Sequence, residues 1–360
     1  MSGGRFMRRS AEGRLSVRQR IWLLLCVVLA VLSALCFFRL HRLRGTLITQ
    51  NAAALWRGES EERFCQISVF LPRDRLGAES DVLSFRRTLD QAMVDASIQA
   101  PEGGSLYADA YSGRLDITVE GPGGKTGVSA LGVGGDYFLF HPLPLLSGSY
   151  LTSRDYMHDR VVLDEELAWS LFGSADVAGM EVTVGGRSYP VAGVIRREED
   201  FASRQARTDA AGMYMDYAAL QRIGEVSIDS YELVMPDPIS GYAESFVQEN
   251  FPLGGAVVQN TGRFSFLRLG KVLLDFGKRS MNENGVLYPY WENAARMVED
   301  YAALSLLLAV LLALAPVISL TVLLLRWAKK GLRHAAGGMK RSIEQRIEDK
   351  KKASYVRRGI

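Results

Sequence analysis

The chain has 360 residues, 48% of them hydrophobic, and a formal net charge of +3. This length has room for one large or two small domains, although two long blocks hold much of the apolar content. The cysteines exclude a disulfide framework, since Cys26 and Cys36 lie in an apolar block and Cys65 stands alone. A bacterial cell surface tolerates such a domain, whereas small eukaryotic secreted domains are more often held by disulfides.

The net charge hides a strong segregation. Residues 1–20 carry six arginines and one acid, and residues 326–360 carry twelve cations and three acids, which leaves 25 cations and 36 acids between them. Each basic tail adjoins an apolar block, and basic flanks favour the cytoplasmic side of a membrane. We expect a protein of the bacterial cell membrane with both termini in the cytoplasm. We expect no nucleic-acid partner, because each basic tail directly adjoins an apolar block.

The first apolar block, residues 21–38 (IWLLLCVVLAVLSALCFF), predicts a transmembrane helix. It is longer than the core of a signal peptide and no small-x-small cleavage site follows it, so we interpret it as an uncleaved anchor. Residues 41–56 predict a helical extension of this span. An extracytoplasmic domain is expected over residues 39–287.

Strands and helices alternate through this domain, which predicts an α+β fold with two lobes, a mixed sheet and covering helices, inserted between two transmembrane helices. The expected elements are a strand at 64–70, a helix at 81–98 capped by Asp81, short strands at 106–110 and 115–120, turns at 121–125 and 132–136, a strand at 160–163, a helix at 165–173 capped by Asp164 and ended by Gly173, a hairpin of 180–184 and 187–195 around Gly185 and Gly186, a strand at 212–215, a helix at 216–223, a strand at 230–235 and a helix at 242–250.

Two further stretches of the domain stand out. Glu198, Glu199 and Asp200 form an acidic cluster beside two arginines, for which a solvated loop is the default and a cation site the alternative. Residues 264–276 are densely apolar and must bury against something. They either pack on the extension of the first span or present a partner surface.

The second apolar block lies near the C-terminus. Residues 288–301 predict a stalk helix, with Trp291 on an apolar face and Glu292, Glu299 and Asp300 off it, half exposed to water. Residues 302–325 form an uncharged stretch long enough to cross a membrane, and residues 326–360 a basic amphipathic tail. Pro316 inside the span is a possible hinge, although membrane helices also tolerate proline for packing alone.

One block, residues 126–196, carries a specific order of motifs. Its matching residues are Asp136, Tyr137, Phe138, Gly148, Thr152, Asp155, Leu171, Phe172, Gly173, Gly179, Val191, Gly193 and Val194. In this order and spacing the block resembles the MacB-like periplasmic core domain of ABC-transporter permeases of the MacB/FtsX type. The resemblance implies a permease subunit that is not an enzyme and needs no cofactor of its own, because ATP binds a separate ABC ATPase subunit.

The resemblance also implies how the ATPase is contacted. Family members have a short cytoplasmic helix after their second span that touches the ATPase, and LRHAAGGMKRSI at 332–343 is similar to it. The expected contact residues are Leu332, Arg333, Met339, Ile343 and Ile347. The family has four spans and this chain shows two, so either a second permease subunit or a second copy in a homodimer supplies the others, or the chain is not a transporter by itself.

No arrangement of residues indicates catalysis. The histidines are scattered without metal-ligand spacing, and no serine, cysteine or lysine has the surroundings of a nucleophile. Two functions therefore remain. The first is a permease-like subunit that transmits ATPase-driven motion to the outside domain. The second is a membrane-anchored binding or scaffold protein without transport activity, whose basic tail lies on membrane lipid.

Overall fold

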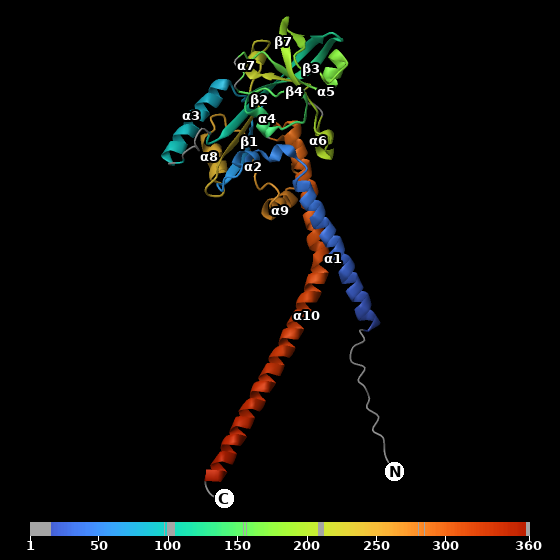
Figure 1. Ribbon diagram of the computed structural model, residues 1–360, viewed down its shortest axis with the longest axis vertical. Helices are drawn as coiled ribbons and strands as arrows, with labels where there is room; N and C mark the ends of the chain where they lie inside the picture. The colour runs from blue at the N-terminus through green and yellow to red at the C-terminus, as the bar shows by residue number, and fades with distance from the viewer. Residues whose placement is uncertain are drawn as a thin grey trace. The chain divides into compact units, whose positions relative to one another are not determined.

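The computed structural model describes residues 16–357 apart from residues 97, 99–104, 154, 156, 208–211, 280 and 284 (Figure 1). In the last helix it also leaves out the side chains of residues 334, 335, 337, 340, 341 and 347–357. The chain divides into two compact units, one of His41–Leu304 and one of Met1–Leu40 with Ser305–Ile360.

The first unit is a mixed α+β domain, as predicted. Its strands are β1 (Phe64–Phe70), β2 (Ala108–Gly121), β3 (Gly124–Gly135), β4 (Leu145–Gly148), β5 (Val161–Asp164), β6 (Glu181–Val184), β7 (Arg187–Ile195), β8 (Met213–Asp216), β9 (Ser230–Pro236), β10 (Ala256–Gln259), β11 (Asn282–Glu283) and β12 (Val286–Leu287). Its helices are η1 (Ile48–Gln50), α2 (Ala52–Arg57), α3 (Glu79–Asp95), α4 (Tyr137–Phe140), α5 (Glu165–Phe172), α6 (Phe201–Ala206), α7 (Tyr217–Gln221), α8 (Tyr242–Asn250) and α9 (Phe266–Leu274).

The large sheet has the order β10-β1-β9-β2-β3-β8-β5-β7-β4, with β6 paired to both β2 and β7. Only the β3–β8 and β5–β7 pairs are parallel. Because β6 joins β7 back to β2, strands β2, β3, β8, β5, β7 and β6 close a ring, while β10, β1 and β9 extend from β2 as an antiparallel sheet. The two lobes therefore share the long β2–β3 hairpin.

Glycines in this hairpin correct two predictions. The strands predicted at 106–110 and 115–120 form one strand, β2, that runs from Ala108 to Gly121. Gly113 inside it is needed for clearance, because a Cβ there would lie 2.2 Å from the carbonyl oxygen of Ser227. The predicted turn at 132–136 is the end of β3, where Gly134 leaves room for the ring of Tyr111 on the paired strand. Both glycines permit close approach of a neighbouring segment instead of a reversal of the chain.

The antiparallel sheet is buried on both faces. On one face lie α3, with Val82, Phe85, Leu89 and Met93, and α8, with Ala243 and Val247; on the other lie α2 and α4. The predicted helix is present, but Asp81 is not its N-cap. The helix begins at Glu79, and the Asp81 carboxylate accepts a hydrogen bond from the backbone N–H of Ala78 at 2.9 Å. The Asp164 cap, the left-handed Gly173 and the Gly185–Gly186 hairpin are all confirmed.

Residues 41–56 are not one helical extension. Helix α1 (Val17–Arg44) ends before Gly45, a residue of low helix propensity. The buried amide of Gln66 in β1 then holds the backbone: it donates to the Thr49 carbonyl at 2.7 Å and accepts from the Ala52 N–H at 3.0 Å. These bonds fix η1 and α2 against the sheet.

The second unit consists of α1 and most of α10 (Tyr290–Arg357), which begins in the domain. Val17–Arg44 and Tyr290–Arg333 are long and apolar enough to cross a membrane, and most of their apolar side chains are exposed. Within this unit the Ser33 hydroxyl donates to the Ala309 carbonyl at 2.8 Å, and the Trp22 indole donates to Ser319 at 3.1 Å. Small and polar residues thus bring the two helices together, as is typical of membrane helices.

Candidate functional site at the start of helix α10

The first four turns of α10, residues 290–304, which we call the α10 root, bury one face in the domain. Trp291, Ala294, Ala295 and Val298 are all less than 5% exposed, at the spacing that the sequence predicts for an apolar face. The Asp300 side chain is 38% exposed, as the sequence predicts, but the two glutamates next to this face are not half exposed to water. Glu292 is 2% exposed and Glu299 is 7% exposed.

These carboxylates are buried because an arginine from a loop neutralises them. Arg263, itself 3% exposed, donates two hydrogen bonds to Glu292, at 2.8 and 2.6 Å, and one to Glu299 at 2.6 Å. Arg279 pairs with Glu299 and, at 2.9 Å, with Asp300. Burial alone lowers the pKa of Arg263, but the two carboxylates outweigh it and the net pKa is raised, so the guanidinium stays charged.

The hydrogen bonds continue from Arg263 across the sheet. Arg263 donates to the Asn260 side chain at 3.1 Å, and Asn260 donates to the Ser68 hydroxyl in β1 at 2.8 Å. Ser68 donates to Glu232 in β9 at 3.2 Å, and the second oxygen of Glu232 lies 2.5 Å from His141 Nε2. All five side chains are buried, so a polar network connects the α10 root to the centre of the sheet.

The far end of this network returns to α10. The ring of His141 stacks on Tyr137 at 4.3 Å and meets the edge of Trp291 at 4.8 Å. Because Trp291 and Glu292 are adjacent on the helix, the root is held from two directions by one connected set of side chains. The root therefore has little freedom to rotate or slide without breaking buried contacts.

A third contact comes from the acidic cluster. The Tyr290 hydroxyl hydrogen-bonds to both carboxylate oxygens of Glu198, at 3.1 and 3.2 Å, and burial raises the pKa of Tyr290 well above its ordinary value. Glu198 is 8% exposed, so the solvated-loop interpretation is wrong for this residue. Glu199 is exposed, and Asp200 caps α6 through the N–H groups of Ala202 and Ser203.

This geometry suits mechanical attachment. In the described part of the chain no group of histidine, cysteine and acidic side chains is arranged to hold a metal ion. What the site provides is a set of buried, mutually dependent ion pairs, in which removal of one partner leaves an uncompensated charge.

A family model, the MacB-like periplasmic core domain, matches residues 60–240, half of the chain and the span from the approach to β1 to the end of β9. The chain belongs to this family of ABC-transporter permeases. Membership gives a membrane protein with an extracytoplasmic domain and implies an ATPase subunit as its partner.

Three solved structures are similar to this MacB-like permease. The periplasmic region of MacB from Actinobacillus actinomycetemcomitans is 19% identical with a TM-score of 0.39, over 54% of this chain and 89% of that one. The extracellular domain of the noncanonical ABC-type transporter YknZ from Gram-positive bacteria is 14% identical with a TM-score of 0.37, over 55% and 99%. A domain of a Porphyromonas gingivalis permease protein is 14% identical with a TM-score of 0.32, over 55% and 88%. No curated protein matched the chain.

The residues that the sequence predicts for the ATPase contact of this MacB-like permease lie far along α10 from the root. Leu332 and Met339 are 71% and 68% exposed, Ile343 is 52% exposed and Arg333 is exposed, whereas the side chain of Ile347 lies outside the described ones. Pro316 lies inside α10, which remains helical through it. The contact and the hinge both remain predictions.

Sequence reasoning missed the arginines that complete the root. Glu292 and Glu299 lie seven residues apart, two turns on one side of the helix, beside an apolar face that begins at Trp291. That spacing indicates two carboxylates on the same side of the helix, both in need of a positively charged partner. It does not reveal that Arg263 and Arg279, on separate loop segments, provide the partners.

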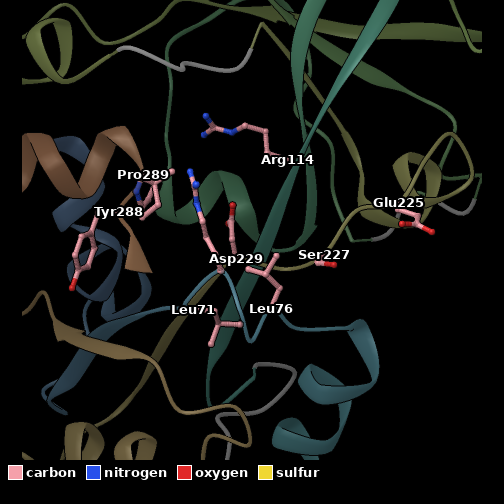
Figure 2. Close-up of a pocket in the computed structure, with 10 residues that line it drawn as sticks. Leu71, Leu76, Arg114, Glu225, Ser227, Asp229, Tyr288 and Pro289 are labelled. Carbon is pink, nitrogen blue, oxygen red and sulfur yellow. The ribbon is translucent and has the colours of Figure 1, made fainter. Parts of the chain in front are cut away.

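A cavity of about 340 Å³ adjoins the segment that leads into the root (Figure 2). It is lined by Leu71, Arg73, Leu76, Arg114, Glu225, Ser227, Asp229, Leu287, Tyr288 and Pro289. Figure 2 shows that this lining comes from the loop after β1, from β2, from the approach to β9 and from the residues before α10. The mixture of charged and apolar side chains gives it no selective chemistry of its own, and we assign it no role.

Proposed function

We propose that this chain is the permease subunit that carries motion from a cytoplasmic ABC ATPase, along α10, to the extracytoplasmic domain. The basic flanks of both apolar blocks support a cytoplasmic position of the two termini. The observation that carries the proposal is α10 itself. It is one helix of 68 residues with a buried, ion-paired root in the domain and an exposed apolar stripe beyond the span.

An unbroken helix is a suitable transmitter. At 1.5 Å per residue α10 is about 100 Å long, and the backbone hydrogen bonds on either side of Pro316 resist stretching and bending. At the root, displacement relative to the domain would leave Glu292, Glu299 or Arg263 buried without a partner, at a cost of about 3–5 kcal/mol. Moving the domain together with the helix keeps these ion pairs and avoids that cost, so motion of the helix is passed to the domain. Pro316 would provide the bend that lets the two halves of the helix tilt differently.

The exposed stripe supports the ATPase end of the proposal. Leu332, Met339 and Ile343 recur at seven and four residues, which places them on one face. Leaving these three apolar side chains exposed to water is unfavourable, and a protein partner would cover them.

The continuity of α10 also favours transmission over the anchored-scaffold alternative. A tail that lay on the membrane surface would have to turn sharply where the span ends, near Trp327. The helix assignment runs through this position without interruption. A straight continuation carries the tail away from the bilayer, toward a cytoplasmic partner.

The test compares two substitutions on opposite faces of the tail. We purify the full chain from its native membrane in mild detergent and measure the ATP hydrolysis that co-purifies with it. Ile343→Asp places a charge in the stripe and should remove most of this activity. Gln345→Asp, two residues away and on the other face, should retain it. Equal activity in both variants, or no ATPase with the parent chain, contradicts the proposal and favours the anchored scaffold.

A further inference from the structure

Helix α9 exposes an apolar face that the domain does not cover. Phe266 is 58% exposed, Leu267 85% and Leu274 80%, while Leu269 is fully buried. At 100° per residue, positions 266, 267, 270, 273 and 274 fall within an arc of about 120°, on a side of the helix separate from Leu269. One edge of α9 therefore packs on the domain, and a wider apolar face remains outside.

Two contacts inside the domain tie this region to the ends of the two candidate spans. The guanidinium of Arg44, the last residue of α1, lies 5.6 Å from the ring centre of Phe266 at the start of α9. Five residues after the end of α9, Arg279 pairs with Asp300 of α10 at 2.9 Å. The segment from α9 to Arg279 is thus held at both of its ends.

The position of these contacts along the helices sets their depth. Arg44 follows the last apolar residue of the first span, Phe38, by six residues, or about 9 Å of helix. Asp300 precedes the first residue of the second apolar stretch, Ala302, by two residues, or about 3 Å. The polar layer on each side of a bilayer core is about 5–7 Å thick, so the Asp300 contact lies within the headgroups and the Arg44 contact lies about 2 Å beyond their edge for an upright helix.

The charges beside the apolar face suit the same layer. Lys271 borders the exposed arc, and its long side chain can reach lipid phosphate while its methylene groups lie on apolar surface. Lys278 is paired with Asp275 at 3.3 Å, and Phe276, between them, is 53% exposed. An apolar face with a cation at its margin is typical of helices that lie in an anionic membrane surface.

We propose that α9 is an interfacial anchor: it lies in the headgroup layer of an anionic bilayer, with Phe266, Leu267 and Leu274 inserted among the lipids. The anchor is separate from the α10 root and from the ATPase contact, and it does not depend on the proposed transmission of motion. It fixes the height of the domain above the membrane at a third point besides the two spans.

Spin labels on the full chain test this anchor. The three native cysteines are replaced (Cys26→Ser, Cys36→Ser, Cys65→Ala), and Leu267→Cys, Leu274→Cys and Trp169→Cys are labelled one at a time with a nitroxide. Trp169 is the matched control, because it is 55% exposed on α5 in the ring lobe. Each protein is reconstituted into vesicles of phosphatidylcholine and phosphatidylglycerol at a ratio of three to one. The measured quantities are collision rates with oxygen, which enters lipid, and with a water-soluble nickel chelate.

We predict a ratio of oxygen to nickel collision rates several-fold higher at positions 267 and 274 than at 169. A ratio equal to that at 169 means that α9 lies in water, and low access to both reagents means that protein covers it; either result overturns the proposal. If the cysteine-free chain does not fold, Leu267→Trp in the native sequence also distinguishes between lipid and water at this position. Brominated lipid quenches the added indole if it lies in the bilayer and leaves it unquenched if it lies in water.

Discussion

The two ends of α10 have similar amphipathic patterns and different surroundings. Both the root, residues 290–304, and the tail after residue 326 combine an apolar stripe with charged residues at helical spacing. In the root the apolar stripe and the two glutamates are buried, with Glu292 at 2% exposure, whereas in the tail Leu332 is 71% exposed. The difference arises from what packs on the helix: loop arginines and the sheet cover the root, and nothing within the described chain covers Leu332, Met339 or Ile343. An amphipathic pattern indicates that a helix needs a partner, and the rest of the fold decides whether that partner lies in the same chain.

The largest expected difference between the two ends is in the free energy of unfolding that is lost when one arginine at each end is replaced by alanine. Arg263→Ala should lower the free energy of unfolding by about 3–5 kcal/mol, because it leaves Glu292 and Glu299 buried without a counter-charge. Arg333→Ala, the same substitution at an exposed position, should change it by less than about 0.5 kcal/mol. Denaturant unfolding of the full chain in detergent measures both. Similar losses in the two variants would mean that the buried ion pairs do not hold the root.

A packing change should give a smaller contrast. Ala295 is fully buried on the root, so Ala295→Leu should cost about 1–3 kcal/mol through overpacking. Ala336 is exposed on the tail, where Ala336→Leu should be close to neutral. The thermal midpoint of the extracytoplasmic domain in each full-length variant makes the comparison. A neutral Ala295→Leu would show that the root is looser than the structure describes.

The smallest effect is expected at Tyr290. Tyr290→Phe removes the hydrogen-bond donor to buried Glu198 and should cost about 1–2 kcal/mol at pH 7. This cost should shrink as the pH rises above about 10, the ordinary value of a tyrosine pKa. The pKa of Tyr290 is raised in the folded chain, so above pH 10 the unfolded chain loses the hydroxyl proton first. The free energy of unfolding of the parent therefore falls as the pH rises. The phenylalanine variant has no such proton and does not lose this contribution.

Unfolding of both proteins at pH 8 and pH 11 provides the comparison. Shifted tyrosines that do not contact residue 290 are common to parent and variant, so their contributions cancel in the difference. A gap between the two proteins that stays constant or widens with pH would contradict a raised pKa at Tyr290.

Much of the domain could be predicted from local patterns. The Asp164 cap and the Gly185–Gly186 hairpin follow from side-chain chemistry within a few residues, and the structure has both. The sequence predicts a break between two strands at Gly113 and a turn at Gly134, because glycine that interrupts or reverses a strand and glycine that admits a close neighbour look alike in sequence. That distinction depends on which segment lies opposite, which a local pattern does not contain.

The candidate site was predictable only in part, for the same reason. The apolar face of the root follows from the spacing of Trp291, Ala294 and Val298. The burial of Glu292 does not, because it requires Arg263 to arrive from a loop 29 residues earlier. Isolated acids next to an apolar face are more often exposed, and the sequence holds no sign of which arginine pairs with them.

The central claim is that α10 passes motion from the ATPase to the domain, and two insertions after Trp327 test it most directly. Four alanines keep the helix continuous, whereas four glycines interrupt it. In the purified complex with the ATPase in lipid nanodiscs, hydrogen exchange of residues 290–304 is measured with and without ATP and vanadate. We predict a nucleotide-dependent change in the parent and the alanine insertion, and none in the glycine insertion although the ATPase stays bound. The same change in all three proteins, or no change in the parent, would contradict transmission through α10.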